Sequence, residues 1–580
     1  MGIPSYYKKL IAVLPGLVSK QCHVVDWLFM DFNCLIYHCL HHAPPYTGEK
    51  EEWEQLFLEC IVVYTKKVIK QVNPKKGIYI AIDGVVPMAK MKQQRLRRFK
   101  SAWLAKQEHD VKKWDTNAIT PGTNFMAQLK ARLLKMIAES SRNMILSSSD
   151  EPGEGEHKII AAWRTNQYQG NYAIYGLDAD LIVLALLGQE TCSLQNQMWL
   201  FREEVVAGAM TRDEQGEEIF EWFSIDLLKT WLMEQLHPCR ETGVARVGGV
   251  GSVGGVGGVG GVGSVGGVGG VGGVGSVGGV GGVGGVRGVG TLVSPLLNYC
   301  FAMSILGNDF LPGSLGLKIR DDGHTELLRI LSCLTVPLID TSLTISMEGV
   351  TELVKQLSLT ESVRICTALS KKQMFSNQLK GETVKVGDPY SAKQKSIGGG
   401  LCQPPDNNWP LTQMEEGFLL ESNTHKKQLV SNWKELYLSR FFSSKKETIC
   451  REYLCGMNWI WQYYTGQPVC FNWYYPFALP PLWEWLQHST VLPSISINLR
   501  ATDIKPIEQL AIVLPLDSWH LLPDCDEKRF PLYAPHFFPA SFSFESVGKR
   551  FFWECESLIP LPTPMELKSI ILHTKVAQLQ

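Results

Sequence analysis

Acidic side chains stand at or just beyond the ends of several strongly apolar stretches of this sequence. One stretch, "SSSDEPGEGEHKIIAAW" at 147–163, holds two glutamates and a histidine in a glycine-broken turn. Another, "YAIYGLDADLIVLAL", contains a pair of aspartates. The acids placed in this way are Asp31, Asp83, Glu154, Glu156, Asp178, Asp180 and Asp309. Each alone has an ordinary explanation, such as a turn or the N-terminus of a helix, where the dipole favours one acid. Their repetition points to a shared chemistry.

Binding of hard cations is the chemistry that best suits this set of acids. Three of the segments read as strands with the acid at their C-terminal end, and such ends meet at one edge of a parallel sheet. Asp178 and Asp180, two residues apart in an extended segment, are expected to face the same side. Gathered carboxylates repel each other unless divalent cations neutralise them. Oxygen-only ligands favour Mg²⁺ or Mn²⁺ over zinc, and two such ions can activate water and stabilise phosphoryl transfer.

A basic segment follows the second acid directly. Residues 90–100 carry six Lys or Arg and no acid. Such a run is commonly a solvated helix face, and that interpretation stays open. Its position next to a predicted metal site favours phosphate binding, because arginine matches phosphate oxygens with two parallel hydrogen bonds. The residues expected to converge on a phosphate are Lys90, Gln94, Arg97 and Arg98.

Residues 1–240 alternate short apolar runs with amphipathic stretches. "VVDWLFMDFN", "GIYIAIDG" and "NYAIYGLDADLIVLAL" read as strands, and helical patterns cover 53–71, 125–140 and 157–166. This alternation predicts an α/β fold with a mostly parallel, twisted sheet flanked by helices.

The rest of the chain divides by composition. Residues 241–290 form a predicted low-complexity insert, whose core at 247–286 contains only Gly, Val and Ser. Glycine's backbone entropy opposes a packed core there, so a flexible loop is expected. Residues 291–380 are predicted to complete the first domain with the last acid and further helices, and 381–410 to form a second linker. Residues 411–580 are expected to be helical at first and then rich in aromatic residues and proline.

Bulk composition limits the class of protein. The net charge of −1 excludes a protein that coats nucleic acid by bulk charge, so any polyanion site must be local. The fifteen cysteines are scattered without paired zinc spacing, which favours reduced thiols and no structural zinc. No signal-peptide layout or membrane-spanning apolar run is found. We therefore expect an intracellular monomer without a membrane partner, with the cytoplasm favoured slightly over the nucleus.

The ordered motifs resemble the Xrn family of 5′→3′ exoribonucleases. They are "MGIP", "DFN", "AIDGVVPMAKMKQQRLRRF", "ITPGTNFM", "PGEGEHKI", "YGLDADLI" and "LGNDFLP", followed by "MNWIWQYYTGQPVCFNWYYPFALPP", "PIEQLAIVLP" and "FFPASFSFESVGKRFFWE". The resemblance spans nearly the whole chain apart from the two linkers. It implies a PIN-like 5′-nuclease fold in which a largely helical second region, 411–580, completes the active-site pocket.

The resemblance also implies an activity and its residues. It implies processive, Mg²⁺-dependent removal of nucleoside 5′-monophosphates from single-stranded RNA bearing a 5′-monophosphate. The seven acids would hold metal, and Lys90, Gln94, Arg97 and Arg98 would bind the 5′-phosphate. Tyr37, followed by His38, stands where the family usually has a histidine that stacks on the terminal base. Trp473 is the candidate for the opposite side of that stack, although an aromatic residue buried between domains is an equal alternative.

Two other functions remain open. A flap endonuclease acting on DNA would share the metal centre, but the glycine-containing helical hairpin typical of such enzymes is not evident after Asp309. A non-catalytic RNA-binding protein of the same fold is the second alternative. The presence of all seven acids counts against it, because unpaired buried carboxylates destabilise a fold that has no use for metal.

Overall fold

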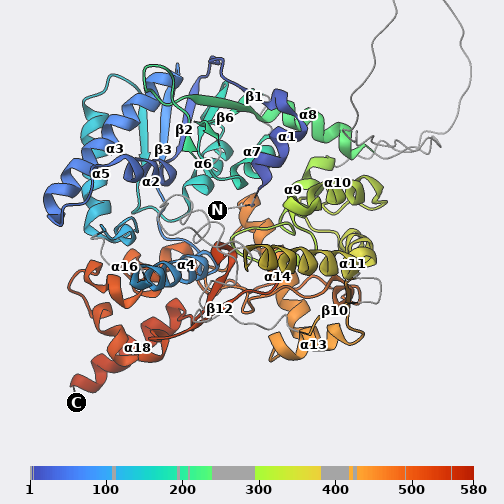
Figure 1. Cartoon of the computed structure of the whole chain (residues 1–580). Coiled ribbons are helices and arrows are strands. Elements are labelled where there is room, and N and C mark those ends of the chain that lie inside the picture. The colour runs from blue at the N-terminus through green and yellow to red at the C-terminus, as the bar shows by residue number, and fades with distance from the viewer. Residues whose placement is uncertain are drawn as a thin grey trace, which may run out of the picture. The chain divides into compact units, whose positions relative to one another are not determined.

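A seven-stranded sheet organises the N-terminal part of the chain, as the computed structural model shows (Figure 1). The structure describes residues 3, 5–107, 113–192, 196–206, 209–237, 294–380, 417–421, 427–489, 491–549 and 552–579. The predicted insert at 241–290 and the predicted linker at 381–410 therefore lie outside the described residues.

The sheet is mostly parallel, as the alternating sequence pattern predicts. Its strand order is β1-β9-β6-β5-β2-β3-β4. The five strands from β6 to β4 run parallel, whereas β9 is antiparallel to both β6 and β1. The bounds are β1 Val18–Ser19, β2 Trp27–Asp31, β3 Gly77–Ala81, β4 Met144–Ser147, β5 Tyr172–Tyr175, β6 Met198–Glu203 and β9 Phe220–Ser224. The central strand β2 is paired along its length with β3 and β5, so the acid that ends it lies in the middle of the sheet edge.

Helices cover both faces of the sheet. Leu28 and Met30 of β2 face one core, which contains side chains of α2, α3 and α5, whereas Trp27 and Phe29 face a second core with α6, α7 and α9. The helices of this part are α1 Tyr6–Val13, α2 Phe32–His42, α3 Lys50–Val72, α4 Met88–Gln107, α5 Asn124–Ala138, α6 Gly155–Arg164, α7 Asp180–Thr191 and α8 Ile225–Leu236. The alternation of side chains along β2 is the two-residue period expected of a strand buried on both faces.

The strand predicted across "NYAIYGLDADLIVLAL" is too long. Strand β5 ends at Tyr175, and the following apolar residues form helix α7, which is buried almost all round. An apolar run of this kind does not separate a strand from a buried helix by periodicity. The other predicted helices agree with α3, α5 and α6 to within about three residues at either end.

The second half of the described chain is largely helical. Its helices are α9 Pro295–Met303, α10 Gly323–Cys333, α11 Met347–Lys380, α13 Trp433–Phe441, α14 Lys446–Thr465, α15 Trp483–Leu486, α16 Pro506–Val513, α17 Phe530–Tyr533 and α18 Pro564–Leu579. Short hairpins accompany them, with strands β7 Val205–Val206, β8 Ala209–Met210, β10 Leu419–Glu421, β11 Lys427–Leu429, β12 Ser543–Glu545 and β13 Glu556–Leu558. Residues 318–380, expected to be helical, contain two helices separated by a non-helical segment that includes Pro337. The hairpin of β10 and β11 was not expected in a region predicted to begin as helix.

The described residues of 1–237 and 294–579 belong to one compact unit. Helix α4 joins the two halves of this unit, because it packs on both α16 and β13 (Figure 1). Arg95, whose side chain is fully buried, donates from Nε to the carbonyl of Pro560 at 3.1 Å and also to the carbonyls of Ile512 and Phe537. The guanidinium therefore connects α4 to three separate C-terminal segments.

We expect Arg95→Ala to lower the free energy of unfolding by roughly 3 kcal/mol or more, because buried carbonyls that lose their donor each cost about 1–3 kcal/mol. Urea unfolding followed by intrinsic fluorescence measures the change. The matched control is Lys106→Ala on the same helix, whose side chain is 62% exposed and pairs with Asp517 at 2.9 Å. An exposed pair is worth about 0–1 kcal/mol, so equal midpoints for the two variants would contradict this account.

Candidate functional site

The ends of β2 and β3 place the first two predicted acids side by side. Asp31 is the last residue of β2, is buried, and precedes the first turn of α2. Asp83 follows β3 by two residues and is held on both oxygens. Asn33 donates to Oδ2 at 2.8 Å, and the backbone N–H of Gly155 donates to Oδ1 at 2.7 Å. A Cβ at Gly155 would lie 2.6 Å from Oδ1 of Asp31, so only glycine allows the two turns to approach this closely.

The glycine-broken turn after β4 supplies the two glutamates. Glu154 is the residue before α6 and Glu156 lies in its first turn, and both are buried. Lys158, also buried, fixes this turn by donating to the carbonyls of Ile82 at 2.7 Å and Ser148 at 2.8 Å. The turn is thereby attached to the end of β3, next to Asp83.

The remaining three acids come from two loops. Asp178 lies between β5 and α7, and Asp180 is the first residue of α7. The expectation that this pair shares one side of a strand is therefore wrong, because β5 has already ended. Asp309 follows α9 in a turn that Asn308 caps, with Oδ1 of Asn308 accepting from the N–H groups of Phe310 and Leu311 at 2.7 Å each.

Electrostatic coupling shows that all seven carboxylates form one cluster. Burial raises the pKa of Asp31 well above its usual value, and the charges of Asp83, Asp178 and Asp180 raise it further. Burial and then the charges of Asp180 and Glu154 likewise raise the pKa of Glu156. The pKa of Asp180 rises to about 7, first through burial and then through Asp178 and Asp309.

Lys90 is a cation in direct contact with two acids of the cluster. Its Nζ lies 2.5 Å from Oε2 of Glu154 and 2.7 Å from Oδ2 of Asp309. Burial alone would raise the pKa of Asp309, but the nearby positive charges, with Lys90 first among them, together lower that pKa to about 2. Among the described residues, Lys90 therefore offsets only part of the negative charge of the seven carboxylates.

The donor set fits a divalent metal. Oδ1 of Asp180 is buried and has no hydrogen-bond partner among the described residues. Ligand atoms of Glu154, Glu156 and His157 lie within 4.8 Å of one another. Buried carboxylate oxygens without donors are what a hard cation requires, so the cluster can hold metal.

Aromatic side chains of α14 cover the cluster, and the sequence analysis did not assign them a role. The hydroxyl of Tyr463 donates to Oε1 of Glu154 at 3.2 Å, and its ring stacks on His157 with centroids 4.0 Å apart. Burial holds the pKa of His157 well below its usual value, so the imidazole is neutral. Burial, and then the charges of Asp180 and Glu156, raise the pKa of the neighbouring Tyr464 well above its usual value. The second half of the chain thus forms one wall of the site.

The four residues predicted to bind phosphate share one side of α4, as their three- and four-residue spacing requires. Lys90 is occupied by Glu154 and Asp309. Gln94 is buried and accepts a hydrogen bond from Gln509 at 3.4 Å. Arg98 is 7% exposed, and its Nη1 has no partner among the described residues. The alternative of a solvated helix face, which the sequence left open, is wrong, because the cations of 90–100 are buried or half-buried.

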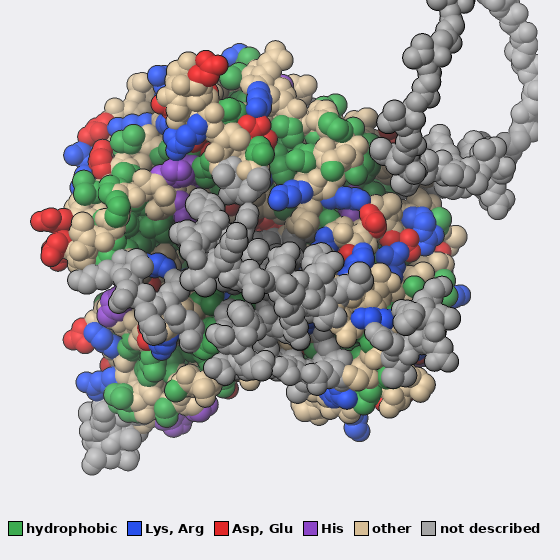
Figure 2. All heavy atoms as spheres, viewed as in Figure 1, with side chains coloured by type: hydrophobic (Ala, Val, Ile, Leu, Met, Phe, Trp, Pro, Cys, Tyr) green, Lys and Arg blue, Asp and Glu red, His purple; other side chains and the backbone are tan. Residues whose placement is uncertain are grey.

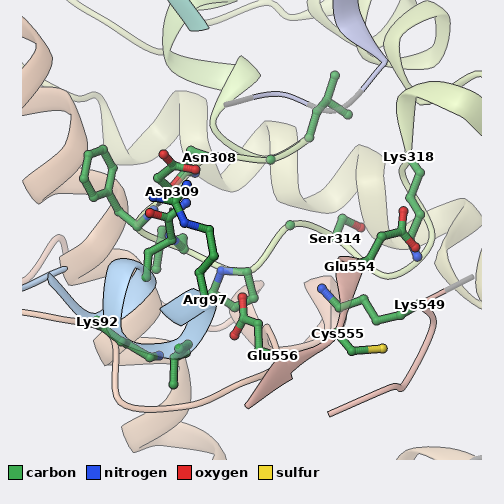
Figure 3. Close-up of a pocket in the computed structure, with 18 of the residues that line it drawn as sticks. Lys92, Arg97, Asn308, Asp309, Ser314, Lys318, Lys549, Glu554, Cys555 and Glu556 are labelled. Atoms are coloured by element: carbon green, nitrogen blue, oxygen red, sulfur yellow. Dashed lines mark hydrogen bonds between the residues drawn. The ribbon is translucent and has the colours of Figure 1, made fainter. Parts of the chain in front are cut away.

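Arg97 lies between the acids and a cavity of about 230 Å³. Figure 3 shows its guanidinium next to Asp309 and Asn308, with Lys318, Lys549 and Glu554 on the far wall. Its charge also contributes to the lowered pKa of Asp309. The cavity is therefore an opening beside the cluster with basic groups on both walls.

The two predicted stacking residues do not meet in this structure. Tyr37 is partly buried on α2. Burial lowers the pKa of Arg98 to about 10, and Tyr37 offsets part of that shift. Trp473 is 8% exposed and packs against Trp459, with ring centroids 5.2 Å apart. No ring contact joins Tyr37 to Trp473 within the described part of the chain. The packing of Trp473 is that of a core aromatic residue, and its stacking on a base stays a prediction.

Figure 2 shows lysine and arginine interspersed with acidic side chains on the visible face. Among the described residues, no helix has both the length and the apolar character needed to cross a membrane. Every cysteine in this part of the chain is a free thiol.

Two family descriptions match the chain on either side of the Gly/Val/Ser tract. "XRN 5′-3′ exonuclease N-terminus" matches residues 1–204, and "Xrn1 helical domain" matches residues 429–568. The first range contains every predicted acid except Asp309, and the second contains the α14 aromatic residues that cover them.

Curated relatives match along almost the entire chain. The 5′-3′ exoribonuclease 1 of Schizosaccharomyces pombe is 26% identical over 97% of this chain and 47% of its own length. The human 5′-3′ exoribonuclease 1 is also 26% identical, over 97% of this chain and 33% of its own length. The 5′-3′ exoribonuclease 2 of Candida albicans is 24% identical over 97% of this chain and 71% of its own length. The chain thus spans about half of the fission yeast relative and a third of the human one.

Replacing one carboxyl group whose pKa is raised tests whether the cluster carries an excess of negative charge. A carboxyl whose pKa is higher in the folded than in the unfolded protein makes folding less favourable as pH rises. For Asp180 this loss of stability occurs between about pH 4, near the ordinary pKa of the group, and about pH 7, its pKa in the folded protein. In metal-free buffer we expect the stability of Asp180→Asn, relative to the wild type, to increase by roughly 1–3 kcal/mol between pH 5 and pH 7. Thermal unfolding in chelator across this range measures the difference. Added Mg²⁺ or Mn²⁺ should then stabilise the wild type more than the variant, and a pH-independent difference would contradict the clustering of these acids.

Proposed function

Because this chain belongs to the XRN 5′-3′ exonuclease family, we propose that it is a 5′→3′ exoribonuclease that degrades RNA with a 5′-monophosphate by metal-dependent hydrolysis. The observation that carries the proposal is the seven-carboxylate cluster lying against the cationic side of α4. A PIN-like nuclease fold is part of the proposal. It is supported by acids that follow the parallel strands β2, β3 and β5 at one edge of the sheet.

The seven carboxylates would hold two Mg²⁺ ions, and Mn²⁺ would suit the same oxygens. When bound, the metals supply charge neutralisation and Lewis-acid activation of the phosphodiester and of water. The residues of the chain do the positioning. Asn33 and the N–H of Gly155 fix the orientation of Asp83, and Lys158 fixes the turn that carries the glutamates. Tyr463 and His157 close the cluster on one side and limit the access of bulk water.

Recognition of a 5′-phosphate would fall to α4. Arg98 offers a buried guanidinium nitrogen without a partner, and a buried donor of this kind gains most from an anionic ligand. Arg97 borders the acids on one side and the basic cavity on the other. A phosphate held by these two arginines would be close to Asp309, so the bond to the next nucleotide could lie over the metal ligands. The single-stranded RNA would be bound by one copy of the chain.

Removing one acid tests the metal centre. We expect Asp178→Ala to reduce metal-dependent decay of 5′-monophosphate RNA by more than roughly 100-fold, since even outer-shell partners of metal ligands are worth about 10–100-fold. RNA binding in chelator should persist. A time course on 3′-labelled RNA with and without Mg²⁺ measures the decay.

The matched control is Asp150→Ala, an acid in the turn before Glu154 whose side chain is 64% exposed and pairs with Lys130 at 2.5 Å. This variant should degrade RNA at the wild-type rate. Full activity of Asp178→Ala would overturn the assignment. Parallel assays on single-stranded DNA and on a DNA flap separate an exoribonuclease from a flap endonuclease, because only the latter would prefer the flap.

Recognition of the 5′ end has its own test. We expect Arg97→Ala to reduce the preference for 5′-monophosphate over 5′-hydroxyl RNA by roughly tenfold or more, because a hydrogen bond to a charged group contributes about 1.5–3 kcal/mol. The ratio of kcat/KM for the two RNAs measures it. Arg97→Lys should retain part of the preference, and Lys106→Ala on the exposed end of α4 should retain all of it. An unchanged ratio in Arg97→Ala would place the phosphate elsewhere.

A further inference from the structure

A second group of metal-ligating side chains lies at the opposite end of α2 from Asp31. His38 and His42 are one helical turn apart, and Glu218 comes from the segment that leads into β9. The ligand atoms of the three residues all lie within 4.8 Å of one another. The structure assigns to His38, His42 and Glu218 a binding site for a zinc-class transition-metal ion, and this assignment does not depend on the proposed nuclease activity.

The ring nitrogens of His38, the buried member of the group, have no hydrogen-bond partner in the described part of the chain. His38 is 3% exposed, and neither ring nitrogen has a hydrogen bond among the described residues. The nearest acidic oxygen, Oε1 of Glu203, is 3.8 Å from Nδ1 and already accepts from the hydroxyls of Tyr64 at 2.6 Å and Tyr175 at 2.7 Å. Burying an imidazole with two unsatisfied nitrogens is costly. A metal ion would satisfy one of them.

The second histidine is held in the form that binds metal. Nδ1 of His42 lies 2.9 Å from the carbonyl oxygen of His38, and because a carbonyl can only accept, Nδ1 carries the proton. The lone pair is then on Nε2. A hydrogen bond from the other ring nitrogen to a carbonyl is the usual way in which proteins orient a histidine ligand. The ring centroids of the two histidines lie 4.6 Å apart, and one ligand nitrogen of each is within 4.8 Å of the other.

Glu218 is paired with two cations, and each of them has a second acceptor. It is paired with Lys67 and, at 3.1 Å, with Arg212. Each cation has another partner in place. Lys67 also contacts Oε2 of Glu217 at 2.6 Å, and Arg212 donates from Nη1 to the carbonyl of Gly216 at 2.7 Å. The ion pairs would be loosened by a metal on Glu218 but not left without acceptors.

The ligand set selects the class of metal. Two imidazoles and one carboxylate suit Zn²⁺, or Co²⁺ and Ni²⁺ in its place, and disfavour Mg²⁺. Solvent water can complete a four-coordinate shell, because His42 is exposed. The ion would also lie at the C-terminal end of α2, where the helix dipole favours positive charge. It would tie α2, the helix that starts from Asp31, to the segment before β9.

The ligand spacing explains why the site is invisible in the sequence. The spacing of the cysteines predicts no structural zinc, but the site proposed here contains no cysteine. The histidines recur at four residues, but the third ligand is 176 residues further along the chain.

Zinc binding to the full chain tests the site, with excess Mg²⁺ present to occupy the carboxylate cluster and a phosphine reductant to keep thiols reduced. We expect the wild type to bind one Zn²⁺ ion tightly. The zinc affinity of His42→Ala should be lower than that of the wild type by more than roughly 100-fold. Glu218→Gln should reduce the affinity by roughly 10–100-fold. The matched control is His41→Ala, an exposed histidine one position earlier that should bind zinc like the wild type.

Two measurements report the result. Competition titration against a chromogenic chelator gives the affinity, and Co²⁺ in place of zinc gives ligand-field bands that should weaken in His42→Ala and persist in His41→Ala. Zinc should also raise the Tm of the wild type but not that of His42→Ala, and the two proteins should unfold alike in chelator. Equal zinc affinity in the wild type and His42→Ala, or an equal loss in His41→Ala, would overturn the assignment.

Discussion

Mutual repulsion of carboxylates is the constraint around which the rest of the structure is arranged. Acids from five separate segments meet at one edge of the sheet, and burial prevents water from screening them. The protein offsets part of this charge. Glu154 and Asp180 lie at the starts of α6 and α7, where helix dipoles favour anions, and Lys90 bridges two acids. The remaining deficit links folding to metal binding, because any ion that binds only the folded cluster stabilises it.

Close backbone contact is the second consequence of gathering acids from separate loops. The turns after β3 and β4 touch, with Gly84 donating to the carbonyl of Gly153 at 2.9 Å. A Cβ at Gly84 would lie 1.7 Å from the carbonyl oxygen of Glu151. The glycines of these turns therefore do more than permit a bend, since they allow two loops to occupy the space that one side chain would fill. Bringing the turns together in this way aligns their acids.

The sequence was informative where chemistry coincides with the ends of apolar segments. Parallel strands with acids after them were predictable because strands β2 and β3 are short, apolar and bounded by turns. Helix α7 was mistaken for a strand because it is buried all round. The roles of Asn33, Tyr463 and His157 could not be predicted, since each depends on a contact with a residue distant in the chain or on another element. Tyr463, for example, meets an acid 309 residues away.

The basic residues of helix α4 have two different roles, which the sequence alone does not distinguish. Lys92 donates to the backbone carbonyl of Tyr475 at 2.8 Å, and Lys100 donates to that of Cys555 at 2.6 Å. Arg95 likewise donates to three backbone carbonyls of the C-terminal half. These three cations fasten the C-terminal half to the helix. Of the others, Lys90 contacts the acids and Arg97 lines the adjoining cavity, whereas Arg98 is buried and has Tyr37 among its neighbours. One helix thus contributes both to the packing of the two halves and to the electrostatics of the site. Because α14 also covers the carboxylates, the C-terminal half is a component of the site, and the geometry of the acids depends on its attachment to α4.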